Sequence, residues 1–156
     1  MSRKEMKVLE DDWISGKAMV LAPQGFEYSN EVLEIQEGEI GFATSGSTGR
    51  PKVVIHTRES LKASAEMVNA HLGVKSGERW LCALPSFHVG GFGVLVRAWV
   101  MGGRAVALAG RWDPGKFLDA IEKEEVCWTS LVPAQVADLV NMGRKAPASL
   151  KGVVVG

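Results

Sequence analysis

The sequence predicts an α/β fold in which helices cover a largely parallel sheet. From Gly38 onward, strand-like and helix-like segments alternate along the chain. The strands are continuous apolar runs, which is typical of strands buried on both faces. The chain has 156 residues, enough for one domain with a substantial core and too few for two. We therefore expect residues 1–37 to be a short N-terminal segment of the same domain as residues 38–156.

The first third of the chain contains two strands joined by a loop of small residues. Up to residue 36 the polarity is mixed and the periodicity weak, and we expect only one or two short strands with loops there. Residues 39–44 alternate like a strand, and residues 53–55 form a second, β-branched strand. Thr57 then serves as the N-cap of a helix that ends at Gly73.

Strands and helices alternate regularly in the rest of the chain. Asp113 followed by Pro114 is a typical helix start, because aspartate caps the helix and proline suits its first position. Strands are expected at residues 80–84, 105–108, 127–132 and 150–156. Helices are expected at residues 90–101, 113–121 and 133–142.

Composition and charge exclude several classes of function. The formal net charge is zero, which gives no reason to expect nucleic acid or an anionic membrane as a partner. The longest apolar stretch, Val89–Met101, is too short and too polar for membrane insertion. The start of the chain has no apolar core of a secretory signal, so we expect a cytoplasmic protein. Cys82 and Cys127 are expected to be small buried hydrophobes, and three dispersed histidines make no zinc pattern.

The loop after the strand at residues 39–44 has the composition of a phosphate-binding loop. Its glycines allow the backbone to approach a ligand closely, and its hydroxyls and amides can donate to phosphate oxygens. Lys52 adds a positive charge. This is not the common P-loop, because Pro51 separates glycine from lysine and a strand follows instead of a helix. A flexible hairpin tip with solubilising hydroxyls is the alternative.

This loop resembles the signature loop of the adenylate-forming superfamily, which includes acyl- and aryl-CoA ligases, luciferases and peptide-synthetase adenylation domains. The residues that match the family pattern are Thr44, Ser45, Gly46, Ser47, Thr48, Gly49 and Lys52. The resemblance implies that they bind the β- and γ-phosphates of ATP, with Lys52 catalytic and Thr48 a ligand of Mg²⁺. Residues 38–156 are then part of an AMP-binding N-terminal domain. Val53 departs from the glycine that many members have.

A second segment, Leu84–Gly91, resembles the next motif of that superfamily, with a proline, an aromatic residue and a histidine after a strand. The resemblance implies that His88 lies beside the acyl pocket and the route of the CoA thiol, where it binds substrate and takes part in catalysis. A histidine between apolar residues is otherwise more often packed in a core. That interpretation is kept for His56 and His71.

Within the superfamily, the chain is most similar to the o-succinylbenzoate–CoA ligases of menaquinone biosynthesis. The segments that carry this likeness are Pro51–Thr57, Phe87–Val89, Arg97 with Trp99, Thr129–Gln135 and Leu150–Gly156. Arg97 interrupts an apolar run, which costs free energy unless the charge is paired or solvated. It is either an arginine that extends to the helix surface, or a ligand of the second carboxylate of a dicarboxylate substrate.

The resemblance implies that a carboxylic acid and ATP form an acyl-adenylate, from which CoA displaces AMP. The adenine-binding loop and the mobile C-terminal domain of the superfamily are not found in these 156 residues. We therefore expect a second polypeptide to supply them, and an open sheet edge to favour association into homo-oligomers. An aryl- or fatty-acid–CoA ligase, a nucleotide-binding module without catalysis and an inert remnant are the alternatives.

Overall fold

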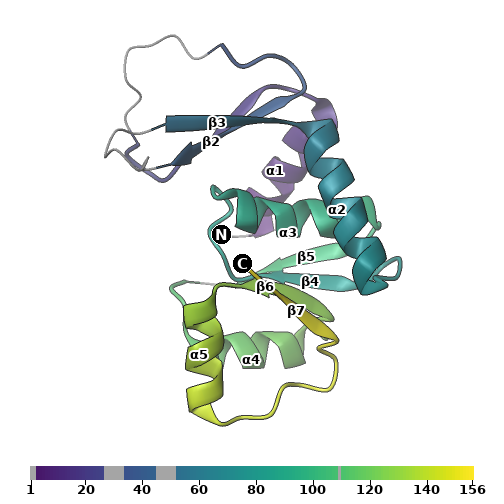
Figure 1. Ribbon diagram of the computed structural model, residues 1–156, viewed down its shortest axis with the longest axis vertical. Coiled ribbons are helices and arrows are strands. Elements are labelled where there is room, and N and C mark those ends of the chain that lie inside the picture. Colours follow the sequence, from purple (N-terminus) through teal and green to yellow (C-terminus); the bar gives the residue numbers. More distant parts are fainter. Residues whose placement is uncertain (1–2, 27–33, 45–51, 109) are drawn as a thin grey trace.

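The computed structural model describes residues 3–26, 34–44, 52–108 and 110–156 (Figure 1). They form two sheets with a helix between them and further helices outside. The elements in chain order are α1 (Arg3–Ser15), β1 (Met19–Leu21), β2 (Glu39–Thr44), β3 (Lys52–Thr57), α2 (Arg58–Leu72), β4 (Arg79–Cys82), α3 (Val89–Val100), β5 (Arg104–Ala107), α4 (Pro114–Lys123), β6 (Trp128–Leu131), α5 (Pro133–Met142) and β7 (Gly152–Val155).

The larger sheet has the order β5-β4-β6-β7, and all its pairings are parallel. Helix α3 lies on one face of it, and α4 and α5 lie on the other (Figure 1). Trp80 stands beside Ala105 on one side and Trp128 on the other, with the two indole rings stacked at 6.1 Å. The predicted α/β fold with a largely parallel sheet is confirmed.

The smaller sheet has the order β1-β2-β3, in which β1 runs parallel to β2 and β3 antiparallel to it. The N-terminal segment contains one of the expected short strands, β1, but the 13-residue helix α1 was not predicted. Met6, Leu9 and Trp13 recur at helical spacing and all pack against the core. Charged residues between them hide this pattern in the sequence.

Among the described helices, α3 is the most deeply buried. Phe92, Val94, Leu95, Val96 and Ala98 are fully buried between the smaller sheet, α2 and the larger sheet. In its first turn the backbone of α3 lies close to the backbone of Pro85. A Cβ at Gly91 would lie 2.2 Å from the carbonyl oxygen of Pro85, so only glycine fits there.

The predicted helix caps are confirmed at α2 and α4. Thr57 accepts a hydrogen bond from the backbone N–H of Ser60 at 3.1 Å, and Gly73 ends α2 in the left-handed conformation. Asp113 accepts from the backbone N–H of Lys116 at 2.8 Å. Local side-chain chemistry therefore determines where these helices begin.

Arg58, the first residue of α2, connects α2 to the end of α1. Its guanidinium donates to the carbonyl oxygens of Trp13 at 3.2 Å, Gly16 at 2.9 Å and Asp12 at 3.1 Å, and also to that of Lys17. Burial lowers the pKa of Arg58, although nearby carboxylates oppose the shift. Since the last carbonyls of a helix have no partner within it, this side chain serves as a C-terminal cap for α1.

We expect Arg58→Ala to lower the free energy of unfolding by about 2–4 kcal/mol, because it removes the hydrogen bonds that the guanidinium donates to four carbonyl oxygens at the end of α1. Urea unfolding followed by tryptophan fluorescence measures this. Arg144→Ala is the matched control, since Arg144 is exposed and pairs only with Asp119 in the described structure; its cost should stay below about 1 kcal/mol. Equal effects of the two substitutions would contradict this role of Arg58.

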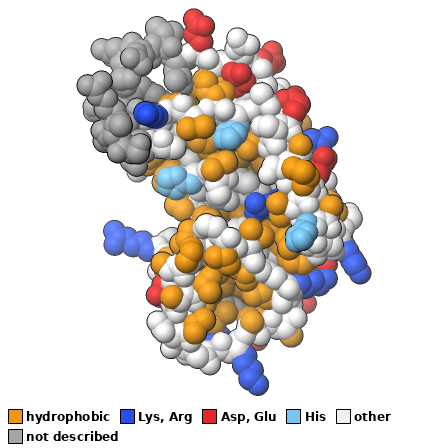
Figure 2. Space-filling view, viewed as in Figure 1, with side chains coloured by type: hydrophobic (Ala, Val, Ile, Leu, Met, Phe, Trp, Pro, Cys, Tyr) orange, Lys and Arg blue, Asp and Glu red, His pale blue; other side chains and the backbone are white. Residues whose placement is uncertain are grey.

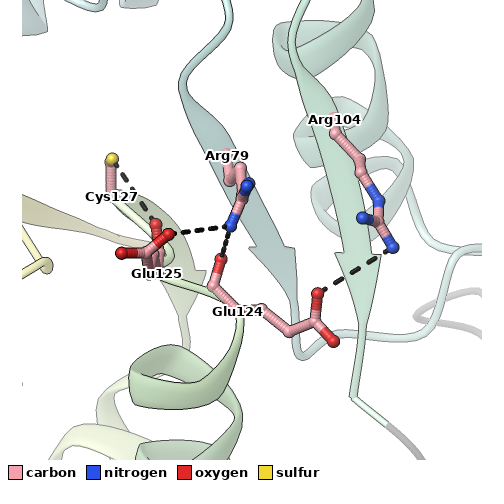
Figure 3. Close-up of polar contacts among 5 residues, drawn as sticks. All are labelled: Arg79, Arg104, Glu124, Glu125 and Cys127. Atoms are coloured by element: carbon pink, nitrogen blue, oxygen red, sulfur yellow. Dashed lines mark hydrogen bonds and ion pairs between the residues drawn. The ribbon is translucent and has the colours of Figure 1, made fainter.

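Charged side chains join the strands at the amino end of the larger sheet (Figure 3). Arg79 donates to the backbone carbonyl of Glu124 and pairs with the Glu125 carboxylate at 3.5 Å, while Arg104 pairs with the Glu124 carboxylate at 3.9 Å. Glu125 has a φ of 49°, in the left-handed region. The turn between α4 and β6 is thus held by arginines of β4 and β5.

Glu78 forms a second polar connection at this end of the sheet. Its carboxylate accepts from the Trp128 indole N–H at 2.6 Å, from the Lys75 backbone N–H at 3.0 Å and from the Lys151 ammonium. Burial alone would raise the pKa of Glu78, but these hydrogen bonds outweigh it and lower the pKa from 4.5 to about 2.

Because the pKa of Glu78 is lowered in the folded state, its ionised form stabilises the fold above about pH 4.5, and this contribution is lost as the pH falls toward 2. We expect Glu78→Gln to be less stable than wild type at neutral pH and to approach it in acid. Unfolding curves between pH 7 and 2 measure the difference. Lys151→Met removes one of the hydrogen bonds and should reduce the pH dependence; an unchanged dependence in both variants would refute the assignment.

Candidate functional site

The two described ends of the predicted phosphate loop face each other across the β2–β3 hairpin. Thr44 and Lys52 are direct partners in the antiparallel ladder, and the Thr44 hydroxyl donates to the Lys52 carbonyl oxygen at 3.3 Å. The loop therefore joins two strands, as predicted, and no helix follows it directly. The remaining predicted loop residues, Ser45, Gly46, Ser47, Thr48 and Gly49, lie outside the described residues.

The face of the hairpin that carries Thr44 and Lys52 is the face that packs on α3. Side chains alternate along a strand, and directly opposite residues share a face, so Phe42, Thr44 and Lys52 all point to the same side. The Phe42 ring meets Phe92 in the first turn of α3 at 5.7 Å. The core thereby fixes β2 two residues before the loop begins.

His88 lies at the junction between β4 and α3. It occupies the N-cap position of α3, where its backbone N–H donates to Pro85 at 3.1 Å and its carbonyl accepts from Phe92 at 2.9 Å. The imidazole is exposed and lies beside the Phe87 ring, with centroids 4.6 Å apart. A packed core histidine is therefore excluded at this position. His56 is half-buried against the edge of Phe42, as expected of a packed histidine.

Arg97 points from α3 onto the larger sheet and does not extend to the helix surface. Its guanidinium donates to the Ser130 hydroxyl at 2.8 Å and lies 5.5 Å from the centre of the Trp80 ring. Burial lowers the pKa of Arg97. The Arg97 carbonyl accepts from the buried Asn69 side chain of α2 at 2.9 Å. The charge of Arg97 in this apolar layer is thus partly satisfied by Ser130 and the Trp80 ring, and one guanidinium nitrogen is used in the hydrogen bond to Ser130.

The larger cavity in the described structure was not predicted from the sequence. It is a cleft of about 960 Å³ at the carboxyl ends of β4 and β5. It is lined by α1, residues 82–87, 107–108 and 110–112, and Gln135. The predicted site residues Thr44, Lys52, His88 and Arg97 do not line this cleft. The signal available in the sequence was Trp112, an aromatic residue between β5 and α4.

Cys82 lines this cleft but has the properties of a structural residue. Burial raises the pKa of the Cys82 thiol to about 11, and its one proton can be donated to the carbonyl oxygen of Leu84 at 3.2 Å or of Gly91 at 3.4 Å. It therefore stays protonated at neutral pH and is no nucleophile. Among the described residues, no group of three histidine, cysteine, aspartate or glutamate side chains could hold a metal ion. Within the same residues, no helix combines the length and the apolar character needed to span a bilayer.

The sequence profile of AMP-binding enzymes matches residues 42–156, which include the hairpin loop, His88, Arg97 and most of the cleft. The chain belongs to the AMP-binding enzyme family. The resemblance to adenylate-forming acid–CoA ligases is thereby confirmed at the level of the family.

Two curated relatives in this family are 2-succinylbenzoate–CoA ligases. The one from Bacillus licheniformis is 32% identical over 126 residues, and the one from Bacillus cytotoxicus is 36% identical over 128 residues. Each match covers 81% of this chain and 26% of the relative. The chain thus spans about a quarter of the length of the curated relatives it matches.

Solved structures of AMP-binding enzymes share the fold. The o-succinylbenzoate CoA synthetase of Bacillus subtilis, in complex with its acyl-adenylate intermediate, has a TM-score of 0.70 at 27% identity; the match covers 100% of this chain and 47% of that structure. The inhibitor-bound N-terminal domain of FACL13 from Mycobacterium tuberculosis has a TM-score of 0.66 at 27% identity, covering 75% and 30%. The architecture of sheets and helices described above is therefore that of the adenylate-forming N-terminal domain.

Proposed function

We propose that this chain supplies the phosphate-binding loop and part of the acyl pocket of an ATP-dependent acid–CoA ligase. The observation that carries the proposal is the hairpin, in which Thr44 and Lys52 face each other at the mouth of a loop of glycines and hydroxyls. The proposed reaction forms an acyl-adenylate and pyrophosphate from a carboxylic acid and ATP. The CoA thiol then displaces AMP to give the thioester.

The first step needs positioned charge around the phosphates more than covalent help from the protein. We assign the hydroxyls and backbone amides of residues 44–49 to the β- and γ-phosphate oxygens. Lys52 is exposed at the start of β3, so its ammonium is free to neutralise charge that develops there. Mg²⁺ supplies further neutralisation when bound; it takes few protein oxygens and keeps several waters, which fits the single hydroxyl of Thr48.

The acid and the CoA thiol are assigned to the region of His88. The imidazole is exposed at the start of α3, below the hairpin face that carries Lys52, so substrate can reach it without a change in packing. We propose that His88 lines the acyl pocket and guides the thiol. Adenylate formation and thioester formation would then take place at one end of α3.

We expect Lys52→Ala to weaken ATP binding by the chain at least tenfold, because a charge-assisted contact to phosphate is lost. Isothermal titration with ATP and Mg²⁺ measures this. Lys62→Ala is the control, since Lys62 is exposed on α2 and pairs with Glu66. Equal ATP affinity in wild type and Lys52→Ala would contradict phosphate binding by Lys52 and favour the alternative, a hairpin tip with solubilising hydroxyls.

We propose o-succinylbenzoate as the acid, with aryl and fatty acids as the alternative substrates. The proposal rests on the likeness to ligases for that acid and on Arg97, a partly buried cation in the last turn of α3. Within the described structure, the Arg97 guanidinium donates one internal hydrogen bond, to the Ser130 hydroxyl. The remaining donors suit the second carboxylate of a dicarboxylate.

We expect Arg97→Ala to weaken binding of o-succinylbenzoate at least tenfold more than binding of benzoate, since only the first acid has a second carboxylate. Titration of both acids with the wild-type chain and the variant measures the difference. Ser130→Ala is the matched control, because it removes the internal hydrogen bond of Arg97 and keeps the charge. Equal losses for both acids, or the same pattern in Ser130→Ala, would assign Arg97 a structural role.

A nucleotide-binding module without catalysis is the second candidate. The chain spans about a quarter of the length of its curated relatives. We propose that turnover needs the part of the ligase that corresponds to the rest of those relatives, in the same or a second polypeptide. Pyrophosphate exchange should then appear only when that part is supplied. Self-association of the chain and a cytoplasmic location, consistent with its free thiols, complete the proposal.

A further inference from the structure

The cleft at the carboxyl ends of β4 and β5 is not used by the proposed function. Its volume of about 960 Å³ lies within the range of small-molecule sites. The residues assigned to ATP and the acid, Thr44, Lys52, His88 and Arg97, do not line it. It therefore needs an explanation of its own.

The topology of the larger sheet explains why a cleft opens there. Strand β4 continues into α3 on one face of the sheet, whereas β5 continues into α4 on the opposite face (Figure 1). The two loops separate as they leave neighbouring strands, and such a divergence beyond the carboxyl ends of parallel strands is a common ligand site. The cleft is thus a consequence of the strand order and not of a local packing defect.

The walls of the cleft are apolar and held in place. Val8 and Leu9 of α1 form one side, and Trp112 lies after β5. The Trp112 indole N–H donates to Asp138 at 2.8 Å, and its ring contacts Phe117 at 5.2 Å, so the ring has a fixed orientation. A preformed apolar wall favours binding because little ordering is needed.

Two exposed charges of opposite sign line the cleft. Arg111 precedes Trp112 in the loop after β5, and Glu5 belongs to the first turn of α1. An anionic group would be attracted to Arg111, which fixes the end of the cleft where a bound anion lies. Figure 2 shows hydrophobic side chains on several parts of the visible surface, so an apolar wall alone does not identify a specific site and the charge of Arg111 is needed.

We propose that this cleft binds a small molecule with an aromatic or similarly bulky apolar body and one anionic group that faces Arg111. The proposed site adjoins the region assigned to the acid, since Phe87 lines the cleft and contacts His88, but it includes none of Thr44, Lys52, His88 and Arg97. It assigns the apolar body to the space between α1 and Trp112.

Fluorescence titration of the full chain with two dyes tests this. Anilinonaphthalene sulfonate has an apolar body and one anionic group, and phenylnaphthylamine is its neutral counterpart. Arg111→Ala should weaken binding of the sulfonate at least tenfold and change binding of the neutral dye less than twofold. Arg144→Ala, which removes an exposed arginine outside the cleft, should change neither. Equal weakening of both dyes by Arg111→Ala, or weakening of neither, would overturn the proposal.

A second pair of variants locates the dye. Val8→Trp places a large side chain into the cleft from α1 and should weaken both dyes at least tenfold. Ile14→Trp makes the same change at an exposed position of α1 that does not line the cleft, and should leave both unchanged. Equal affinities in these two variants would show that the dyes bind elsewhere on the apolar surface and would refute the site. Circular dichroism of each variant establishes that the fold is retained.

Discussion

The burial of α3 between two sheets is the constraint on which the rest of the structure depends. A helix that is apolar on all sides has to be covered on all sides, and here the β2–β3 hairpin, α2 and the parallel sheet each cover part of it. The contact between Phe42 and Phe92 sets the position of the hairpin, and the contact between Gly91 and Pro85 sets the position of the turn that carries His88. Both ends of the proposed site are thus fixed by the same helix.

Arg97 is the one charged side chain of this buried helix. A core of this kind would be more stable with an apolar residue, unless the charge is satisfied or has a use. Ser130, together with the Trp80 ring, satisfies part of it. The remaining guanidinium donors connect the packing of the fold with the chemistry proposed for the acid.

Features with a local cause could be predicted from the sequence. The caps at Thr57 and Asp113 and the strand–loop–strand arrangement around Thr44 and Lys52 depend on neighbouring residues, and the structure has them where expected. Helix α1 could not be predicted, because its apolar residues are few and its end is held by Arg58, more than forty residues away. The cleft depends on the order of strands in the sheet, which no short segment of sequence contains.

Strand β3 has Lys52 at one end, and Arg58 follows directly after the other end. Six residues of extended chain, about 20 Å long, therefore connect the phosphate loop to the residue that holds the end of α1. Helix α1 in turn forms a wall of the cleft. One strand and one arginine side chain therefore connect the proposed phosphate loop with the wall of the cleft.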